Sequence, residues 1–194
     1  FYQSHRKGSI VMEGFGWLNK STREKADPRR AEETLAQLHE TPYFLFPLQL
    51  STDFQIREHS PFADMKEALD YVLYSFARRA PKHVRLLIKE HPLDCSFMSW
   101  RSHIMAQARK AGIEDRILHI AGGELDELAA NAVGMVTINS TSATLALAGG
   151  IPTMALGKAI YNIPQITHQG RLDEFWTRPQ APDPGPYEAF SRVL

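Results

Sequence analysis

Residues 133–156 read VGMVTINSTSATLALAGGIPTMAL, and they contain a strand, a helix and a second strand in close succession. The apolar run at 133–138 predicts a buried strand, and another apolar run follows at 152–156. Between them, the helix formers at 143–148 end at two glycines, which predicts a short helix. Because the connections are too short for anything but a crossover, the two strands are predicted to run parallel.

The same alternation extends toward the N-terminus. Further strands are predicted at 43–48, 84–88 and 116–120, and helices at 61–80, 99–111 and 124–131. Each predicted strand is an almost continuous apolar run, which is typical of a parallel sheet covered by helices on both faces. The sequence therefore predicts the α/β class, with a Rossmann-like, doubly wound parallel sheet of at least five strands.

The chain divides into three predicted parts. Residues 1–40 are predicted to be a linker and a connecting helix from a missing N-terminal domain, since Asp27-Pro28 is a typical helix start. Residues 41–178 are predicted to form the Rossmann-like domain. Residues 179–194 are predicted to be a C-terminal loop, with four of the 12 prolines between 179 and 186, followed by a helix from Tyr187.

Composition excludes several classes of protein. Lys and Arg number 22, and so do Asp and Glu, so a formal net charge of zero argues against a nucleic-acid-binding platform. No apolar run approaches the ~18 residues of a membrane span. Cys95 is the only cysteine, which excludes an intrachain disulfide and favours a reducing compartment such as the cytoplasm.

Polar residues follow all five predicted strands. In an open parallel sheet, ligands bind beyond the carboxyl ends of the strands, so these residues are candidates for a ligand cleft. The candidates are Gln49 and Asp53, Lys89, Glu90 and His91, Gly122 and Gly123, Asn139 with Ser140, Thr141 and Ser142, and Lys158 with Tyr161. A single polar loop would carry little weight, because loops are generally polar, but the coincidence of five such loops favours a binding edge.

Ser140, Thr141 and Ser142 give the strongest signal for a ligand. Three hydroxyl groups lie at a strand-to-helix junction, where unpaired N–H groups and the helix dipole favour an anion. The alternative interpretation is that Ser140 or Thr141 simply caps the helix. Asn139-Ser140-Thr141 also matches the glycosylation sequon, but no secretory signal accompanies it, and we expect no glycosylation.

His91-Pro92 ends another predicted strand. A histidine there can donate a hydrogen bond to a phosphate oxygen, and the alternative is an ordinary half-buried loop histidine. Lys89 and Glu90 alternate in direction, so only one of them is expected to share the side of His91. Dinucleotide, Walker A and serine-hydrolase glycine motifs are absent, and the eight histidines are scattered without ligand spacing, so we expect no metal and no cofactor.

Several segments resemble one bacterial family. FPLQLSTDFQI at 46–56, IKEHPLD at 88–94, the stretch at 134–164 and THQGRLDEFW at 167–176 are similar to the capsule polysaccharide synthesis and export family. Its members include β-Kdo glycosyltransferases that build the capsule lipid linker. The resemblance implies the C-terminal, nucleotide-binding half of a GT-B glycosyltransferase, with CMP-Kdo as donor and a phosphatidylglycerol-type lipid, or its first Kdo, as acceptor.

The resemblance also implies roles for particular residues. His91 corresponds to a His-Pro motif, and Ser140, Thr141 and Ser142 to a Ser/Thr motif, which together hold the CMP phosphate. Preorganised donors suit a leaving group that gains negative charge. The family's acidic motif is absent here, so the catalytic residue is unknown, a carboxylate is expected in the N-terminal domain, and this chain alone is expected to be inactive.

Two other interpretations remain open. One is a non-catalytic nucleotide-sugar-binding or scaffold domain in capsule export, and the other is an epimerase-like GT-B enzyme that acts on UDP-sugars. The expected partners are a CMP-sugar donor, a lipid-linked acceptor and other capsule assembly proteins. The expected location is the cytoplasm, either free or at the periphery of the inner membrane. Nucleotide preference would separate these interpretations.

Overall fold

The computed structural model describes residues 41–50, 52–94 and 99–193, together with Thr34, Ala36 and Leu38, which are helical. The predicted linker and connecting helix at 1–40 otherwise lie outside the described residues, and so does Cys95.

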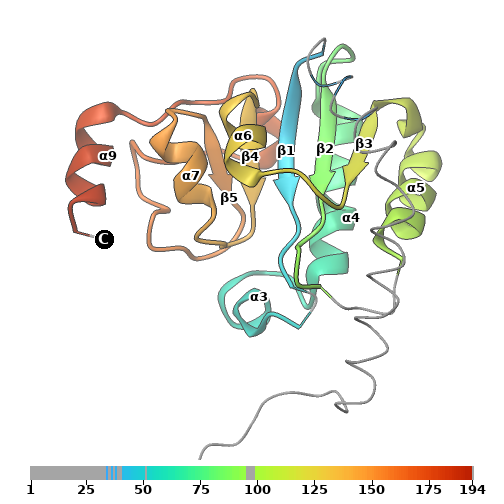
Figure 1. Ribbon diagram of the computed structural model, residues 1–194, viewed down its shortest axis with the longest axis horizontal. Coiled ribbons are helices and arrows are strands. Elements are labelled where there is room, and N and C mark those ends of the chain that lie inside the picture. Colours follow the sequence, from blue (N-terminus) through green and yellow to red (C-terminus); the bar gives the residue numbers. More distant parts are fainter. Residues whose placement is uncertain are drawn as a thin grey trace, which may run out of the picture.

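A five-stranded parallel sheet forms the centre of the molecule (Figure 1). Its strands are β1 (Tyr43–Pro47), β2 (Arg85–Lys89), β3 (Ile117–Ile120), β4 (Gly134–Thr137) and β5 (Thr153–Ala155). They lie in the order β3-β2-β1-β4-β5, and every neighbouring pair is parallel. This order is that of a Rossmann-type sheet. Successive strands are added on one side of β1 up to β3 and then on the other side from β4, so the strand order reverses between β1 and β4. The predicted fold class is therefore confirmed.

Helices cover both faces of the sheet (Figure 1). One face packs against α4 (Met65–Arg79), α5 (Trp100–Ala111) and α8 (Leu172–Phe175). The other packs against α6 (Leu125–Ala130) and α7 (Ala143–Ala148), with α9 (Pro184–Ser191) beside α7. A short 3₁₀ turn, η1 (Glu114–Arg116), leads into β3, and α3 (Phe54–His59) lies beyond the carboxyl end of β1.

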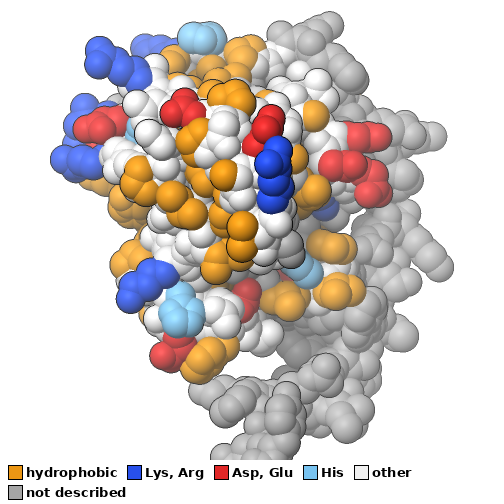
Figure 2. Space-filling view, turned by 90° about the vertical axis from the view of Figure 1, so that its left-hand side faces the viewer, with side chains coloured by type: hydrophobic (Ala, Val, Ile, Leu, Met, Phe, Trp, Pro, Cys, Tyr) orange, Lys and Arg blue, Asp and Glu red, His pale blue; other side chains and the backbone are white. Residues whose placement is uncertain are grey.

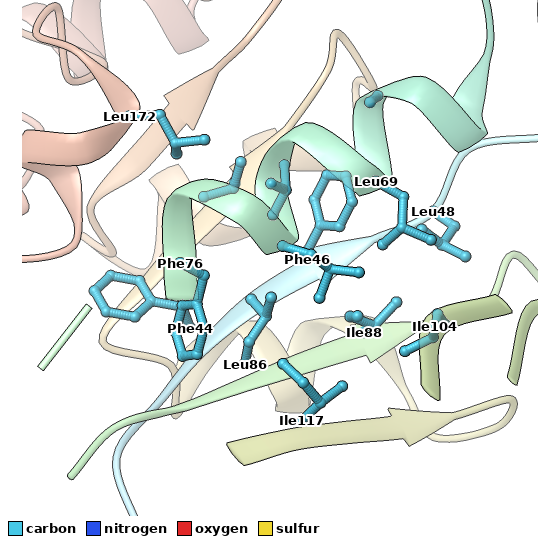
Figure 3. Packing of buried hydrophobic residues seen from close by; sticks show 14 of the residues in the cluster. Phe44, Phe46, Leu48, Leu69, Phe76, Leu86, Ile88, Ile104, Ile117 and Leu172 are labelled. Carbon is cyan, nitrogen blue, oxygen red and sulfur yellow. The ribbon is translucent and has the colours of Figure 1, made fainter. Parts of the chain in front are cut away.

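The alternation of side chains along β1 explains the two apolar layers. Phe44 and Phe46 point into the cluster under α4, whereas Tyr43 and Leu45 point into the cluster under α6 and α7. Figure 3 shows the first layer, in which the side chains of β1 and β2 meet Leu69 and Phe76 of α4. Because both faces are buried, the strands carry apolar residues at most positions, which is why they appear as almost continuous apolar runs in the sequence.

Four helices differ from the prediction. The predicted helix at 61–80 begins only at Met65, because the Asp64 side chain accepts a hydrogen bond from the Glu67 N–H and caps it. The C-terminal helix begins at Pro184 rather than Tyr187, since proline is favoured in the first helical turn. The predicted loop at 179–186 is correspondingly shorter. The short helices α3 and α8 were not predicted, because neither spans two full turns of apolar periodicity.

The surface over α7 and α9 has no continuous charged patch. Figure 2 shows that face, where acidic and basic side chains are interspersed with one another and with hydrophobic and uncharged ones. This distribution agrees with the formal net charge of zero. No helix in the described part of the chain is both long and apolar enough to cross a membrane.

Candidate functional site

The candidate residues lie along the carboxyl ends of the strands, on the side of the sheet where α3 lies (Figure 1). Here the loops after β1 and β4 are neighbours, and they border the switch point at which the strand order reverses. Crevices at such a point are the usual ligand sites of open parallel sheets. The structure brings Gln49, Asp53 and Asn139 into direct contact at this position.

Gln49 links the β1 loop to the β4 loop. Its Nε2 donates to the Asn139 Oδ1 at 2.9 Å, and its Oε1 accepts from the Asn139 backbone N–H at 3.0 Å. The same Nε2 donates to the Asp53 Oδ2 at 3.0 Å. Gln49 is only 5% exposed, so these bonds satisfy an amide that would otherwise be buried without partners.

Asp53 and Asn139 connect this pair to α3. The Asp53 side chain caps α3 by accepting from the Gln55 N–H at 2.9 Å. Asn139 donates from its Nδ2 to the Gln55 carbonyl oxygen at 3.0 Å. The first turn of α3 is thus bonded to both loops. An Asp before six helical residues is the capping signal in the sequence that points to α3.

The hydroxyl groups of Ser140 and Ser142 contact each other. Their Oγ atoms are 2.8 Å apart, and the Ser142 N–H donates to the Ser140 Oγ at 3.3 Å. The side chain of Thr141 is exposed. Ser142 occupies the N-cap position of α7 without a side-chain capping bond, so the interpretation that Ser140 or Thr141 caps this helix is wrong. Two hydroxyl oxygens are therefore held together beside an exposed third one.

The contribution expected from a helix dipole needs correction. α7 has only six residues, which is less than two turns, and a helix of this length adds little to the field at its N-terminus. The chemical character of the loop therefore comes from its hydroxyl groups and its backbone amides. Such a loop offers neutral hydrogen-bond donors to an anion.

Tyr161 bonds to the same loop from the buried side of the domain. Its side chain is completely buried, and its hydroxyl donates to the Ser140 carbonyl oxygen at 2.6 Å. Burial raises the pKa of the Tyr161 phenol well above its ordinary value, so the phenol remains a donor at neutral pH. Tyr161 was predicted to line the cleft, but the structure places it beneath the loop. Lys158 is exposed, and its backbone N–H donates to the His59 carbonyl oxygen of α3 at 2.6 Å.

His91 lies two strands away from the hydroxyl loop. Its Nδ1 accepts from the Leu93 N–H at 3.1 Å, which assigns the proton of the neutral ring to Nε2. β1 lies between β2 and β4, so the strands that His91 and Ser140 follow are near each other in the sheet but not adjacent. Two strand spacings amount to about 10 Å, which is the largest separation at which we expect the two loops to converge on one phosphate.

Lys89 and Glu90 point to opposite faces, as the strand alternation predicts. Lys89 is buried at 5% exposure, on the face that Leu87 shares with α6 and α7. The Glu90 carboxylate lies 2.7 Å from the Nε2 of His119 on β3. Lys89 is therefore turned into the protein, whereas the ion-paired Glu90 side chain stays partly exposed.

Gly122 and Gly123 do not join the cluster. They follow β3, which is three strands from β4, and both are exposed. Gly123 has φ +82°, a conformation that favours glycine, so a turn explains its presence. Among the described residues, no group of three or more His, Cys, Asp or Glu side chains is arranged to hold a metal ion.

The fold and these loops define a Rossmann-type domain with a polar site at its switch point. The family described as "Capsule polysaccharide biosynthesis protein" matches residues 1–194. The chain belongs to this family, which confirms the resemblance carried by the sequence motifs.

Curated relatives agree with this assignment. The chain is 34% identical over 201 residues to the capsule polysaccharide export protein KpsS of Escherichia coli, covering 100% of this chain and 50% of that protein. It is 37% identical over 149 residues to the capsule polysaccharide modification protein LipB of Neisseria meningitidis serogroup A, covering 76% of this chain and 36% of that protein. The chain thus spans half or less of the length of these relatives.

A solved structure is also similar. It is the β-Kdo 2,7-transferase KpsC of Thermosulfurimonas dismutans, with a TM-score of 0.47 and 14% sequence identity. The match covers 88% of this chain and 52% of that one.

Proposed function

We propose that this chain is the donor-binding domain of a glycosyltransferase that transfers Kdo from CMP-Kdo to a lipid-linked acceptor during capsule polysaccharide biosynthesis. The proposal is supported by family membership and by the position of the polar loops at the switch point of a Rossmann-type sheet. The single observation that carries it is the hydroxyl pair of Ser140 and Ser142, held beside the β1 loop.

The proposed chemistry concerns the leaving group. When the sugar is transferred, the oxygen of an acceptor hydroxyl group bonds to the anomeric carbon, and its proton passes to the carboxylate expected in the N-terminal domain. The bond between the anomeric carbon and the phosphate oxygen breaks, and CMP leaves with the bonding electrons. The hydroxyl groups of Ser140, Thr141 and Ser142, and the Nε2–H of His91, would donate hydrogen bonds to the phosphate oxygens as their negative charge grows. A single phosphate group stabilised by such donors does not require a metal ion.

The proposal places the remaining chemistry outside this domain. The carboxylate that would activate the acceptor is expected in the N-terminal domain of the full enzyme, so the chain alone should bind nucleotide without transferring sugar. The acceptor and other capsule assembly proteins would be the partners of the full enzyme, in the cytoplasm or at the periphery of the inner membrane.

Calorimetric titration with CMP, UMP, UDP and cytidine tests the proposal. We expect CMP to bind more tightly than UMP and UDP, because a cytosine-specific donor site should discriminate the base. We also expect cytidine to bind more weakly than CMP, because it lacks the phosphate. Tighter binding of UDP would favour an epimerase-like enzyme instead, and binding of none of the four would favour a scaffold domain.

A further inference from the structure

We propose that Gln49 is a positioning residue for the phosphate-binding loop, which it holds through Asn139, and that Tyr161 is the second fixed point of the same loop. This inference rests on the proposed function, because it assigns a role to two residues that would not touch the donor themselves. It concerns the loop formed by Asn139, Ser140, Thr141 and Ser142, called the hydroxyl loop below.

The contact between Gln49 and Asn139 has two points. The amide oxygen of Gln49 accepts the Asn139 backbone N–H at 3.0 Å, and the amide nitrogen donates to the Asn139 side chain at 2.9 Å. Two bonds between the same two residues fix orientation as well as distance. The Asp53 carboxylate accepts the second N–H of the Gln49 amide at 3.0 Å, which fixes the plane of the amide.

Tyr161 fixes the loop from the opposite side. The sheet order places β4 between β1 and β5, so the hydroxyl loop has one neighbouring loop on each side. Gln49, which follows β1, accepts the N–H of Asn139, and Tyr161, which follows β5, donates to the carbonyl of Ser140 at 2.6 Å. Two consecutive residues of the hydroxyl loop are thus bonded to the two neighbouring strands' loops through buried side chains.

Gln49 itself is not placed to contact a ligand. Both N–H groups of its amide are used, one by Asp53 and one by Asn139, and the residue is 5% exposed. Its influence on a phosphate must therefore pass through the hydroxyl loop. Hydrogen-bond donors that are already in place when charge develops need no reorganisation, and this is the benefit that a rigid loop gives.

The test compares Gln49→Met, which keeps the length of the side chain but removes its hydrogen bonds, with a matched control. The control is Gln107→Met, since the Gln107 amide also bonds a carboxylate, that of Asp70 at 3.2 Å, but lies between α4 and α5. For Gln49→Met we expect CMP affinity to fall about tenfold, while cytidine affinity stays within about twofold of the wild type. Gln107→Met should leave both affinities unchanged.

Two results would overturn the inference. Unchanged CMP affinity in Gln49→Met would show that phosphate binding does not depend on the hydrogen bonds between Gln49 and Asn139. A parallel loss of CMP and cytidine affinity would show general damage rather than a displaced loop. If Gln49→Met does not fold, Tyr161→Phe removes only the bond to Ser140 and should reduce CMP affinity in the same selective way; an unchanged affinity there would equally contradict the inference.

A second readout separates this inference from the proposed function. The backbone N–H of Ser140 donates to the Thr137 Oγ1, and the backbone N–H of Ser142 donates to the Ser140 Oγ. Neither of these two amides bonds to Gln49. Gln49→Met should accelerate hydrogen exchange at both amides, and Gln107→Met should not. If the wild-type chain binds no CMP, the proposed function fails, yet this exchange pattern still supports the positioning of the hydroxyl loop by Gln49. Equal exchange in the two variants would overturn that positioning role.

Discussion

The two edges of the sheet are built from different chemistry. At the carboxyl edge, amide and hydroxyl side chains from three loops bond to one another around Gln49 and Asn139. At the amino edge, where β1 and β4 begin, aromatic rings close the end of the sheet. Phe44 and Trp176 lie 4.9 Å apart in an edge-to-face arrangement.

Packing at the amino edge is tight where β1 and β4 begin. Gly134 begins β4, and a side chain there would meet the Phe175 ring at 2.8 Å. Trp176 is 1% exposed, and its indole N–H donates to the Ser75 Oγ at 2.8 Å, which ties α8 to α4. The amino edge therefore stabilises the domain through apolar burial, whereas the carboxyl edge uses hydrogen bonds between polar side chains to arrange its loops.

The largest expected effect is on stability and lies at the amino edge. Trp176→Ala should lower the free energy of unfolding by about 3–5 kcal/mol, because it removes a fully buried indole together with its bond to Ser75. Urea denaturation measures this loss. The exposed aromatic Tyr74, which belongs to α4 itself, is the control, and Tyr74→Ala should cost less than about 1 kcal/mol.

The comparison between the edges predicts a second result for the same variant. In conditions where Trp176→Ala is folded, its CMP affinity should remain within about twofold of the wild type, because the cluster lies at the opposite end of the strands. A tenfold loss of affinity in the folded variant would mean that the two edges are not independent.

The next effect is on binding and lies at the carboxyl edge. His91→Ala and the double variant Ser140→Ala/Thr141→Ala should each weaken CMP binding about tenfold to a hundredfold, because each removes charge-assisted hydrogen bonds to phosphate. Calorimetry measures this, with urea denaturation as the control for stability. Equal losses for CMP and cytidine would show that these residues do not contact the phosphate, and His91 would then be an ordinary loop histidine.

A smaller effect concerns how the stability of the amino edge depends on pH. His168 follows β5 and packs against Phe175 at the amino edge, with ring centroids 5.3 Å apart. Neither of its ring nitrogens has a hydrogen-bond partner in the described part of the chain. Burial lowers the pKa of His168 below its ordinary value, while the Glu174 carboxylate acts in the opposite direction.

The sign of the pH effect follows from proton binding. Below about pH 6.5 the unfolded chain binds a proton at His168 that the folded chain binds only at lower pH, so stability is complete above that pH and falls as pH decreases. One proton limits the slope to about 1.4 kcal/mol per pH unit. His168→Leu should flatten this decline in urea denaturation, and His83→Leu, at an exposed histidine, should not. A decline that persists unchanged in His168→Leu would assign it to other groups.

The smallest expected effect is that of a chelator. Since hydroxyl and imidazole donors are proposed to stabilise the phosphate, EDTA should leave both the CMP affinity and the melting temperature unchanged. A loss of CMP binding after EDTA treatment, restored by a divalent cation, would contradict the proposed metal-independent stabilisation of the leaving group.

The sequence was sufficient for the fold because the fold depends on local patterns. Continuous apolar runs at 84–88 and 133–138 identified buried parallel strands, and the glycines that follow α7 marked its end. The helices α3 and α8 escaped prediction because each is shorter than two turns. In addition, α8 is bonded to α4 by the hydrogen bond from the Ser75 hydroxyl to Asp173, which are 98 residues apart.

The candidate site was predictable only in part. Sequence position could place Gln49 and Asn139 at the same edge, since both follow strands, but not show that they bond each other across 90 residues. It also could not show that β1 separates His91 from Ser140, because strand order is a property of the whole sheet. The burial of Tyr161 beneath the hydroxyl loop was likewise invisible, since a tyrosine after a strand fits either a cleft or a core.

The most direct test of the central claim is an NMR titration of the isotopically labelled chain with CMP. The claim is that the carboxyl edge binds the nucleotide phosphate and the amino edge does not. We predict shifts of the backbone amides of Ser140 and Ser142 and of the side-chain amide of Gln49, with the Trp176 indole signal unchanged. Shifts confined to Trp176 and its neighbours, or no shift at either edge at saturating CMP, would contradict the claim.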